Sequence, residues 1–106
     1  MGFLDMFKTP DIDSGVDECR ETRNAVLLDV RTAEEYRQGH IPESVNVPLD
    51  EIGRADGQIP DKETPVFTYC LSGARSARAA AELRRRGYSR VKNIGGISSY
   101  SGKIVR

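Results

Sequence analysis

Cys70 opens a short segment whose residue types favour a reactive thiol. The segment consists of Cys70, Leu71, Ser72, Gly73, Ala74, Arg75 and Ser76. Glycine permits a tight turn in which successive backbone N–H groups point inward and bind an anion. The N-terminus of the helix expected after the turn and the cation of Arg75 add positive potential. Together these features predict a thiol with a lowered pKa, in a pocket that also suits an anionic persulfide.

A less reactive role for Cys70 stays open, because free cysteine is among the most buried residue types and packs as a small hydrophobe. Cys19, the other cysteine of the chain, lies in a helical pattern with no glycine-rich loop, and we expect it only to pack. The two cysteines form neither a C-x-x-C pair nor a metal cluster, so we expect no metal and no cofactor. A reducing, cytoplasmic setting is the simplest interpretation.

Length and charge narrow the class of protein. The chain has 106 residues with 16 basic and 16 acidic side chains, which fits one domain and disfavours nucleic acid as a partner. No apolar run is long enough to cross a membrane, so we expect no membrane partner. Residues 1–12 are predicted to be an N-terminal leader, and residues 13–106 the domain itself.

The pattern along the chain alternates between helices and strands. Ser14 is the expected cap of the first helix, and Thr32 with Glu35 forms a capping box for a second helix that ends at Gln38. Helices are predicted over 15–22, 33–38 and 76–86, with a helical turn over 50–54 and a loop at Gly57 and Pro60. Strands are predicted over 25–28 (running on into Asp29 and Val30), 44–47, 65–69 and 91–94. This alternation predicts an α/β sandwich with a mainly parallel sheet, with Cys70 at the carboxyl end of a strand, where such folds bind ligands.

Four motifs, in order along the chain, resemble the rhodanese-like domain family. They are Asp29-Val30-Arg31 with Glu34-Glu35-Tyr36 and Gly39-His40-Ile41-Pro42; Asn46-Val47-Pro48-Leu49; the Cys-x-x-Gly-x-Arg-Ser loop from Cys70 to Ser76; and Asn93-Ile94-Gly95-Gly96 as a late turn. Each motif alone is weak, but the ordered set is specific and spans about residues 14–100.

The resemblance implies a rhodanese-like three-layer sandwich, with a parallel sheet flanked by helices. It also implies a sulfurtransferase in which catalytic Cys70 accepts a sulfane sulfur and residues 71–76 bind the persulfide. The donor would be a small molecule such as thiosulfate, and the acceptor cyanide or a thiol; a protein donor or acceptor is also open. Arg75 is the one cation of this loop, which disfavours the thiosulfate dianion as the natural donor.

Other polar residues of the motifs receive more modest roles. Asp29 and Arg31 are expected to anchor loops, because a charged pair at a strand end commonly does so. His40 is expected to be a structural turn residue, since an ionised thiol needs no general base. Arg75 is expected to act in the site, by orienting the loop or binding the donor's oxygens.

Two other functions compete with sulfur transfer. Cysteine phosphatases and arsenate reductases use a similar loop with five residues between cysteine and arginine, whereas four separate Cys70 from Arg75. The shorter loop favours one sulfur atom over a phosphoryl group. A non-catalytic docking or sulfur-relay module is the second alternative, although such modules usually lack the loop cysteine.

Overall fold

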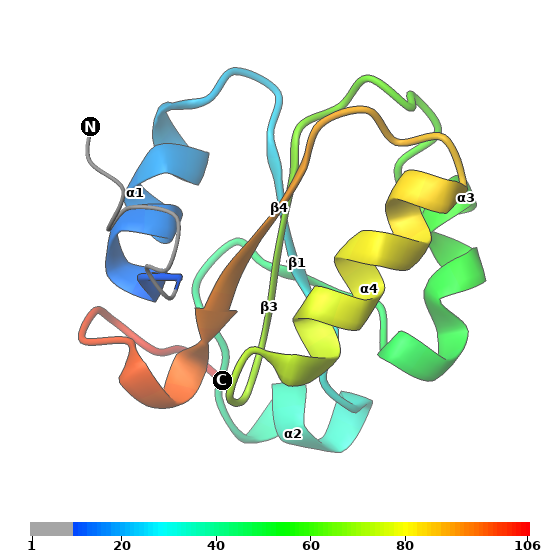
Figure 1. Cartoon of the computed structure of the whole chain (residues 1–106). Helices are drawn as coiled ribbons and strands as arrows, with labels where there is room; N and C mark the ends of the chain where they lie inside the picture. Colours follow the sequence, from blue (N-terminus) through cyan, green and yellow to red (C-terminus); the bar gives the residue numbers. More distant parts are fainter. Residues whose placement is uncertain (1–9) are drawn as a thin grey trace.

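A parallel sheet runs through the centre of the molecule (Figure 1). The computed structural model describes residues 10–106, and in that part of the chain the sheet has four strands in the order β2-β1-β3-β4. The strands are β1 (Val26–Asp29), β2 (Val45–Asn46), β3 (Val66–Cys70) and β4 (Val91–Gly96). Every paired neighbour in this sheet is parallel, so the predicted α/β class is confirmed.

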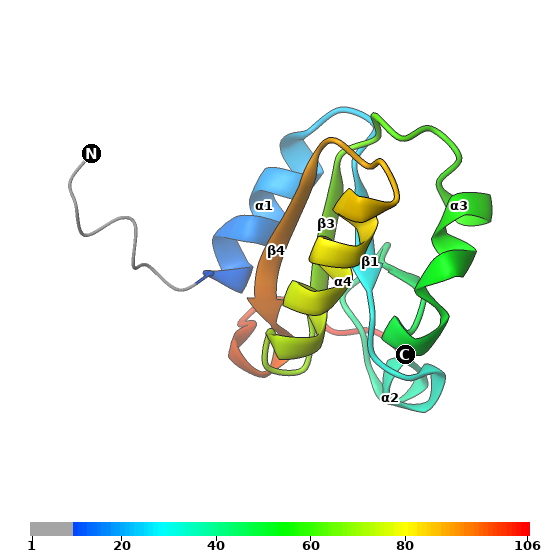
Figure 2. The same cartoon turned by 45° about the vertical axis from the view of Figure 1, so that its right-hand side comes forward.

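Helices cover both faces of this sheet. They are α1 (Ile12–Glu21), α2 (Ala33–Gln38), α3 (Ala55–Gln58) and α4 (Ala74–Arg85), with 3₁₀ segments η2 (Leu49–Arg54) and η3 (Ile97–Ser99). Figure 2 shows α1 on one face and α4 with α3 on the other. The result is the three-layer sandwich that the sequence predicted. Both views place α2 and the β3–α4 turn at the same end of the molecule.

Strand β3 divides the hydrophobic core into two parts. Phe67 and Tyr69 belong to the cluster that includes α1, whereas Val66 and Cys70 belong to the cluster that includes α4. This division follows from the alternation of side chains along a strand. The thiol of Cys70 therefore lies on the face of the sheet that α4 covers.

The first helix begins earlier than the sequence suggested. Asp11 is its N-cap in place of Ser14, because the Asp11 carboxylate accepts hydrogen bonds from the Asp13 N–H at 3.1 Å and from the Ser14 hydroxyl at 2.6 Å. Helix α1 consequently begins inside the predicted leader 1–12, whose residues 1–9 lie outside the described residues. No helix among residues 10–106 combines the length and the hydropathy needed to cross a membrane.

The predicted late turn at Gly95 and Gly96 is wrong, because both residues extend β4. They pair with Tyr69 and Cys70 after a shift of register in β3, which carries β4 past the predicted end at 94. A Cβ atom on Gly96 would lie 2.3 Å from the Leu71 carbonyl oxygen. Glycine is therefore required where β4 passes the segment that follows Cys70.

Two helical predictions also needed changes. Helix α4 begins at Ala74, two residues before the predicted start. The predicted turn over 50–54 is the 3₁₀ segment η2, and α3 follows it directly. Gly57 consequently lies in a short helix and not in a loop.

Candidate active site

A tight turn joins β3 to α4 immediately after Cys70. Gly73 adopts a φ of +104°, a left-handed conformation that L side chains rarely adopt, so glycine is favoured there. The Thr68 hydroxyl donates to the Ser76 carbonyl at 3.0 Å and ties the strand to the first turn of the helix. The left-handed turn at Gly73 and the hydrogen bond between Thr68 and Ser76 hold the N-terminus of α4 beside the thiol.

Hydrogen-bond donors converge on the sulfur of Cys70, which is 1% exposed. The Gly73 N–H lies 3.0 Å from Sγ, and the Ser76 N–H and hydroxyl each lie 3.4 Å from it. Burial acts to raise the pKa of this thiol, but the hydrogen bonds from Ser76, Gly73 and the Ser72 backbone together outweigh burial and lower the pKa. The turn therefore favours an anionic sulfur.

The guanidinium of Arg75 pairs with Glu35 of α2. Two hydrogen bonds, of 2.7 and 3.0 Å, join Nη1 and Nη2 of Arg75 to the carboxylate. Glu35 is also held by Thr32 in the predicted capping box, and the bond from Arg75 is the main reason that the pKa of Glu35 falls to about 2. The charge of Arg75 is thus balanced by Glu35, and the hydrogen bonds to the sulfur come from Ser76, Gly73 and the Ser72 backbone.

Asn93 of β4 is a site residue that sequence reasoning did not single out. Its Oδ1 accepts from the Ser76 hydroxyl at 2.7 Å and from the Gly95 N–H at 3.1 Å, and its Nδ2 donates to the Gly73 carbonyl at 3.3 Å. Asn93 therefore fixes two of the residues that surround the sulfur. The signal available in the sequence was its place at the start of the last motif.

The sequence profile of the Rhodanese-like domain family matches residues 14–103. The chain belongs to this family. A sulfurtransferase from Allochromatium vinosum is 39% identical over 92 residues, which span 86% of this chain and 85% of the relative. The thiosulfate sulfurtransferase PspE from Escherichia coli is 39% identical over 80 residues, spanning 74% of this chain and 77% of PspE. A solved rhodanese with anions from E. coli superposes with a TM-score of 0.72 at 35% identity, covering 77% of this chain and 98% of that one.

A buried ion pair supports α2 in this rhodanese-like domain. Arg31 lies 2.7 Å from the Asp29 carboxylate, and their side chains are 6% and 0% exposed. The same guanidinium donates to the Gly39 carbonyl at 2.7 Å and to the Glu35 carbonyl at 3.4 Å. Asp29 and Arg31 therefore hold the helix that carries Glu35, a placement that suits an anchoring role.

His40 makes its contacts away from the thiol. Its ring stacks on Tyr36 with the centroids 3.7 Å apart, and Nδ1–H donates to the Tyr36 carbonyl at 2.8 Å. The backbone of His40 pairs with Val105 near the end of the chain. This histidine joins α2 to the C-terminal segment of the rhodanese-like domain, which suits a structural role.

Uncharged side chains form the outer edge of the loop beside Cys70. Leu71 is 47% exposed, and Ser72 and Ala74 are exposed as well. Ser76 is fully buried against the sulfur. The loop thus presents Leu71, Ser72 and Ala74 to solvent, together with a partly exposed Arg75 that is paired with Glu35, and it keeps the Ser76 donors inside.

Proposed function

We propose that this rhodanese-like domain moves a sulfane sulfur from a donor such as thiosulfate to a thiophilic acceptor through a persulfide on Cys70. The convergence of the Gly73 and Ser76 donors on Sγ carries the proposal. Such donors stabilise a thiolate before the reaction and a negatively charged outer sulfur after it. Cys70 is the catalytic residue, and residues 71–76 form the persulfide-binding loop.

In the first step, the thiolate of Cys70 attacks the outer sulfur of thiosulfate. The S–S bond of thiosulfate breaks, and sulfite leaves with the electron pair. The product is Cys70–S–S⁻, so the charge on both sides of the step is the same. Because the thiol pKa is already lowered by Ser76 and Gly73 against the effect of burial, the step needs no general base.

In the second step, the acceptor takes the outer sulfur. Cyanide attacks it and leaves as thiocyanate, or a thiolate attacks it and leaves as a new persulfide; either way the Cys70 thiolate is regenerated. A partner protein that carries the attacking thiol would have to reach the exposed side of the loop at Leu71 and Ser72. A protein donor would use the same route.

The test is the intact mass of the protein after incubation with thiosulfate. We expect a gain of about 32 Da on Cys70, removed by a reducing thiol, because a persulfide is a reversible modification. Cys70→Ser should take up no sulfur. Efficient hydrolysis of aryl phosphates, with no sulfur gained from thiosulfate or any persulfide, would favour the phosphatase alternative instead.

A further inference from the structure

The charge of Arg75, the cation of the Cys70 loop, is cancelled by Glu35. Arg75 is the one charged residue among residues 70–76, and its guanidinium is bound through two nitrogens to the Glu35 carboxylate. Both side chains are partly exposed, at 34% and 29%, so the pair lies at the surface beside the loop. An incoming anion meets this neutral pair beside the loop, while the exposed Arg78 lies one turn further along α4.

Glu35 is held in this position by its own helix. Its Oε1 accepts from the Thr32 N–H at 2.9 Å, and its N–H donates to the Thr32 hydroxyl at 3.1 Å. Arg31 anchors the same residue through the Glu35 carbonyl. The carboxylate is therefore fixed against Arg75 from a separate element, α2.

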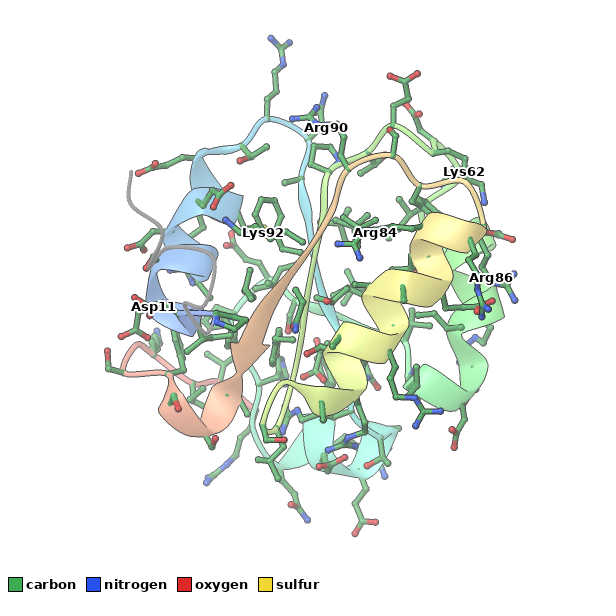
Figure 3. All side chains as sticks on the ribbon, viewed as in Figure 1. Asp11, Lys62, Arg84, Arg86, Arg90 and Lys92 are labelled. Atoms are coloured by element: carbon green, nitrogen blue, oxygen red, sulfur yellow. The ribbon has the colours of Figure 1, made fainter. Side chains whose placement is uncertain are left out.

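Other cations lie on parts of the surface away from the loop. Figure 3 shows Lys62, Arg84, Arg86, Arg90 and Lys92 over the middle and upper parts of the view, whereas α2 and the β3–α4 turn lie at its lower end. Lys62 and Lys92 are each paired with a carboxylate at 2.6 Å. These residues lie too far from the loop to replace the charge of Arg75 that Glu35 cancels.

We propose that Glu35 is a specificity-determining residue that cancels the charge of Arg75 and so disfavours the thiosulfate dianion relative to persulfides of organic thiols. The inference rests on the proposed sulfur transfer through Cys70. A free cation attracts a dianion twice as strongly as a monoanion at the same distance. With a persulfide donor R–S–SH, the Cys70 thiolate attacks the outer sulfur and the thiolate RS⁻ leaves, which gives Cys70–S–SH with charge conserved.

Two variants restore a positive charge by different routes. Glu35→Gln frees the charge of Arg75 and keeps an amide oxygen for the capping box, in which glutamine also serves. Leu71→Lys adds a cation at the exposed edge of the loop and leaves the Arg75–Glu35 pair intact. Glu34→Gln is the matched control, because it removes the same charge from the exposed side of α2, where Glu34 has no ion-pair partner among residues 10–106.

The measurement is kcat/KM for thiosulfate divided by kcat/KM for 2-mercaptoethanol persulfide, with cyanide as the acceptor. The ratio removes any general damage to the loop, because both donors react with the same thiolate. We expect it to rise about tenfold in Glu35→Gln and in Leu71→Lys at low ionic strength. The gain should shrink at 1 M salt, where exposed charges are screened within about 3 Å. Glu34→Gln should leave the ratio within about twofold of the wild type.

A ratio that stays within about twofold of the wild type in either Glu35→Gln or Leu71→Lys would overturn the inference. If the persulfide still loads Cys70 in that case, sulfur transfer itself survives. If no donor loads Cys70 in the wild-type protein, both proposals fall. A cysteine desulfurase that carries its own persulfide, used as a third donor, tests whether the natural persulfide donor is a protein or a small molecule. Faster loading of Cys70 from the desulfurase than from the small persulfide indicates a protein donor. Faster loading from the small persulfide indicates a small thiol.

Discussion

The two cysteines of this domain are both buried, yet their surroundings shift their pKa values in opposite directions. Cys70 is 1% exposed and Cys19 is 7% exposed. Burial raises the pKa of Cys19 to about 11, against a smaller lowering by Arg20. Burial also acts to raise the pKa of Cys70, but Ser76 and Gly73 donate hydrogen bonds that lower it.

Position in the fold explains this difference. Cys19 lies inside α1 (Ile12–Glu21), where the nearby backbone N–H groups are used by the helix itself. Cys70 ends a strand, so the turn and the first residues of α4 offer N–H groups that have no partner within the helix. The pKa of Cys70 is therefore lowered, in spite of burial, by the Ser76 hydroxyl together with backbone N–H groups of the turn and the helix start, and Cys19 has no such donors among residues 10–106.

The largest expected effect comes from removing each sulfur in turn. Cys70→Ser should take up no sulfane sulfur from thiosulfate or from a persulfide, because no other described thiol is surrounded by donors. Cys19→Ser should keep sulfur transfer close to the wild-type rate. Intact mass and thiocyanate formation measure both. A Cys19→Ser protein that folds but transfers no sulfur would indicate a relay between the two cysteines. Cys19 would then be reactive, in contradiction to the contrast between the two thiols.

The pH dependence of alkylation separates the two thiols directly. In Cys19→Ser, the reaction of Cys70 with iodoacetamide should have a midpoint below that of a free thiol, about 8.5. The rate should fall only as pH drops through that lowered pKa, since protonation then removes the thiolate. In Cys70→Ser, Cys19 should stay slow until the pH approaches about 11. A Cys70 midpoint at or above the free-thiol value would contradict the role given to Gly73 and Ser76.

A smaller effect is expected from the hydroxyl of Ser76. Ser76→Ala removes the hydroxyl, whose one hydrogen is shared between Asn93 Oδ1 at 2.7 Å and Sγ at 3.4 Å, and leaves the backbone N–H in place. We expect alkylation of Cys70 below its pKa to slow by about tenfold, the usual cost of one hydrogen bond to a charged group. Ser76→Thr keeps the hydroxyl and should retain most of the rate. Equal rates in the alanine variant and the wild type would mean that the backbone donors suffice.

Local signals explain which parts of the fold were predictable. Thr32 and Glu35 predicted the start of α2, and the capping box is present, because its partners are three residues apart. The continuous apolar pattern of residues 65–69 likewise predicted β3. Gly95 and Gly96 were assigned to a turn because the last motif resembles a late Gly-Gly turn of the family, but the close passage of β4 by Leu71 requires glycine within the strand.

The contacts of the site were harder to predict because they join distant parts of the chain. Arg75 and Glu35 are 40 positions apart, and Ser76 and Asn93 are 17 apart. Each residue belonged to a recognised motif, but a motif does not state which side chain of another element it meets. The sequence placed the cation of Arg75 near the sulfur, and only the placement of α2 revealed that its guanidinium also pairs with Glu35.

Removal of the Arg75 guanidinium is expected to have the smallest effect on the thiol. Its charge is balanced by Glu35, so Arg75→Ala should leave alkylation of Cys70 by neutral iodoacetamide within about threefold of the wild type. Loading by thiosulfate should fall further, by about tenfold at low salt, because the variant leaves the Glu35 carboxylate facing a dianion.

Arg84→Ala is the matched control for Arg75→Ala. Arg84 lies in the last turn of the same helix and donates to the Val91 carbonyl at 2.8 Å, at the far end of α4 from the turn (Figure 1). Both alkylation and thiosulfate loading should stay within about twofold of the wild type in this variant. If Arg75→Ala slowed alkylation as much as Ser76→Ala does, the arginine would act on the sulfur itself. The contrast between Cys70 and Cys19 would then rest on a cation as well as on backbone donors.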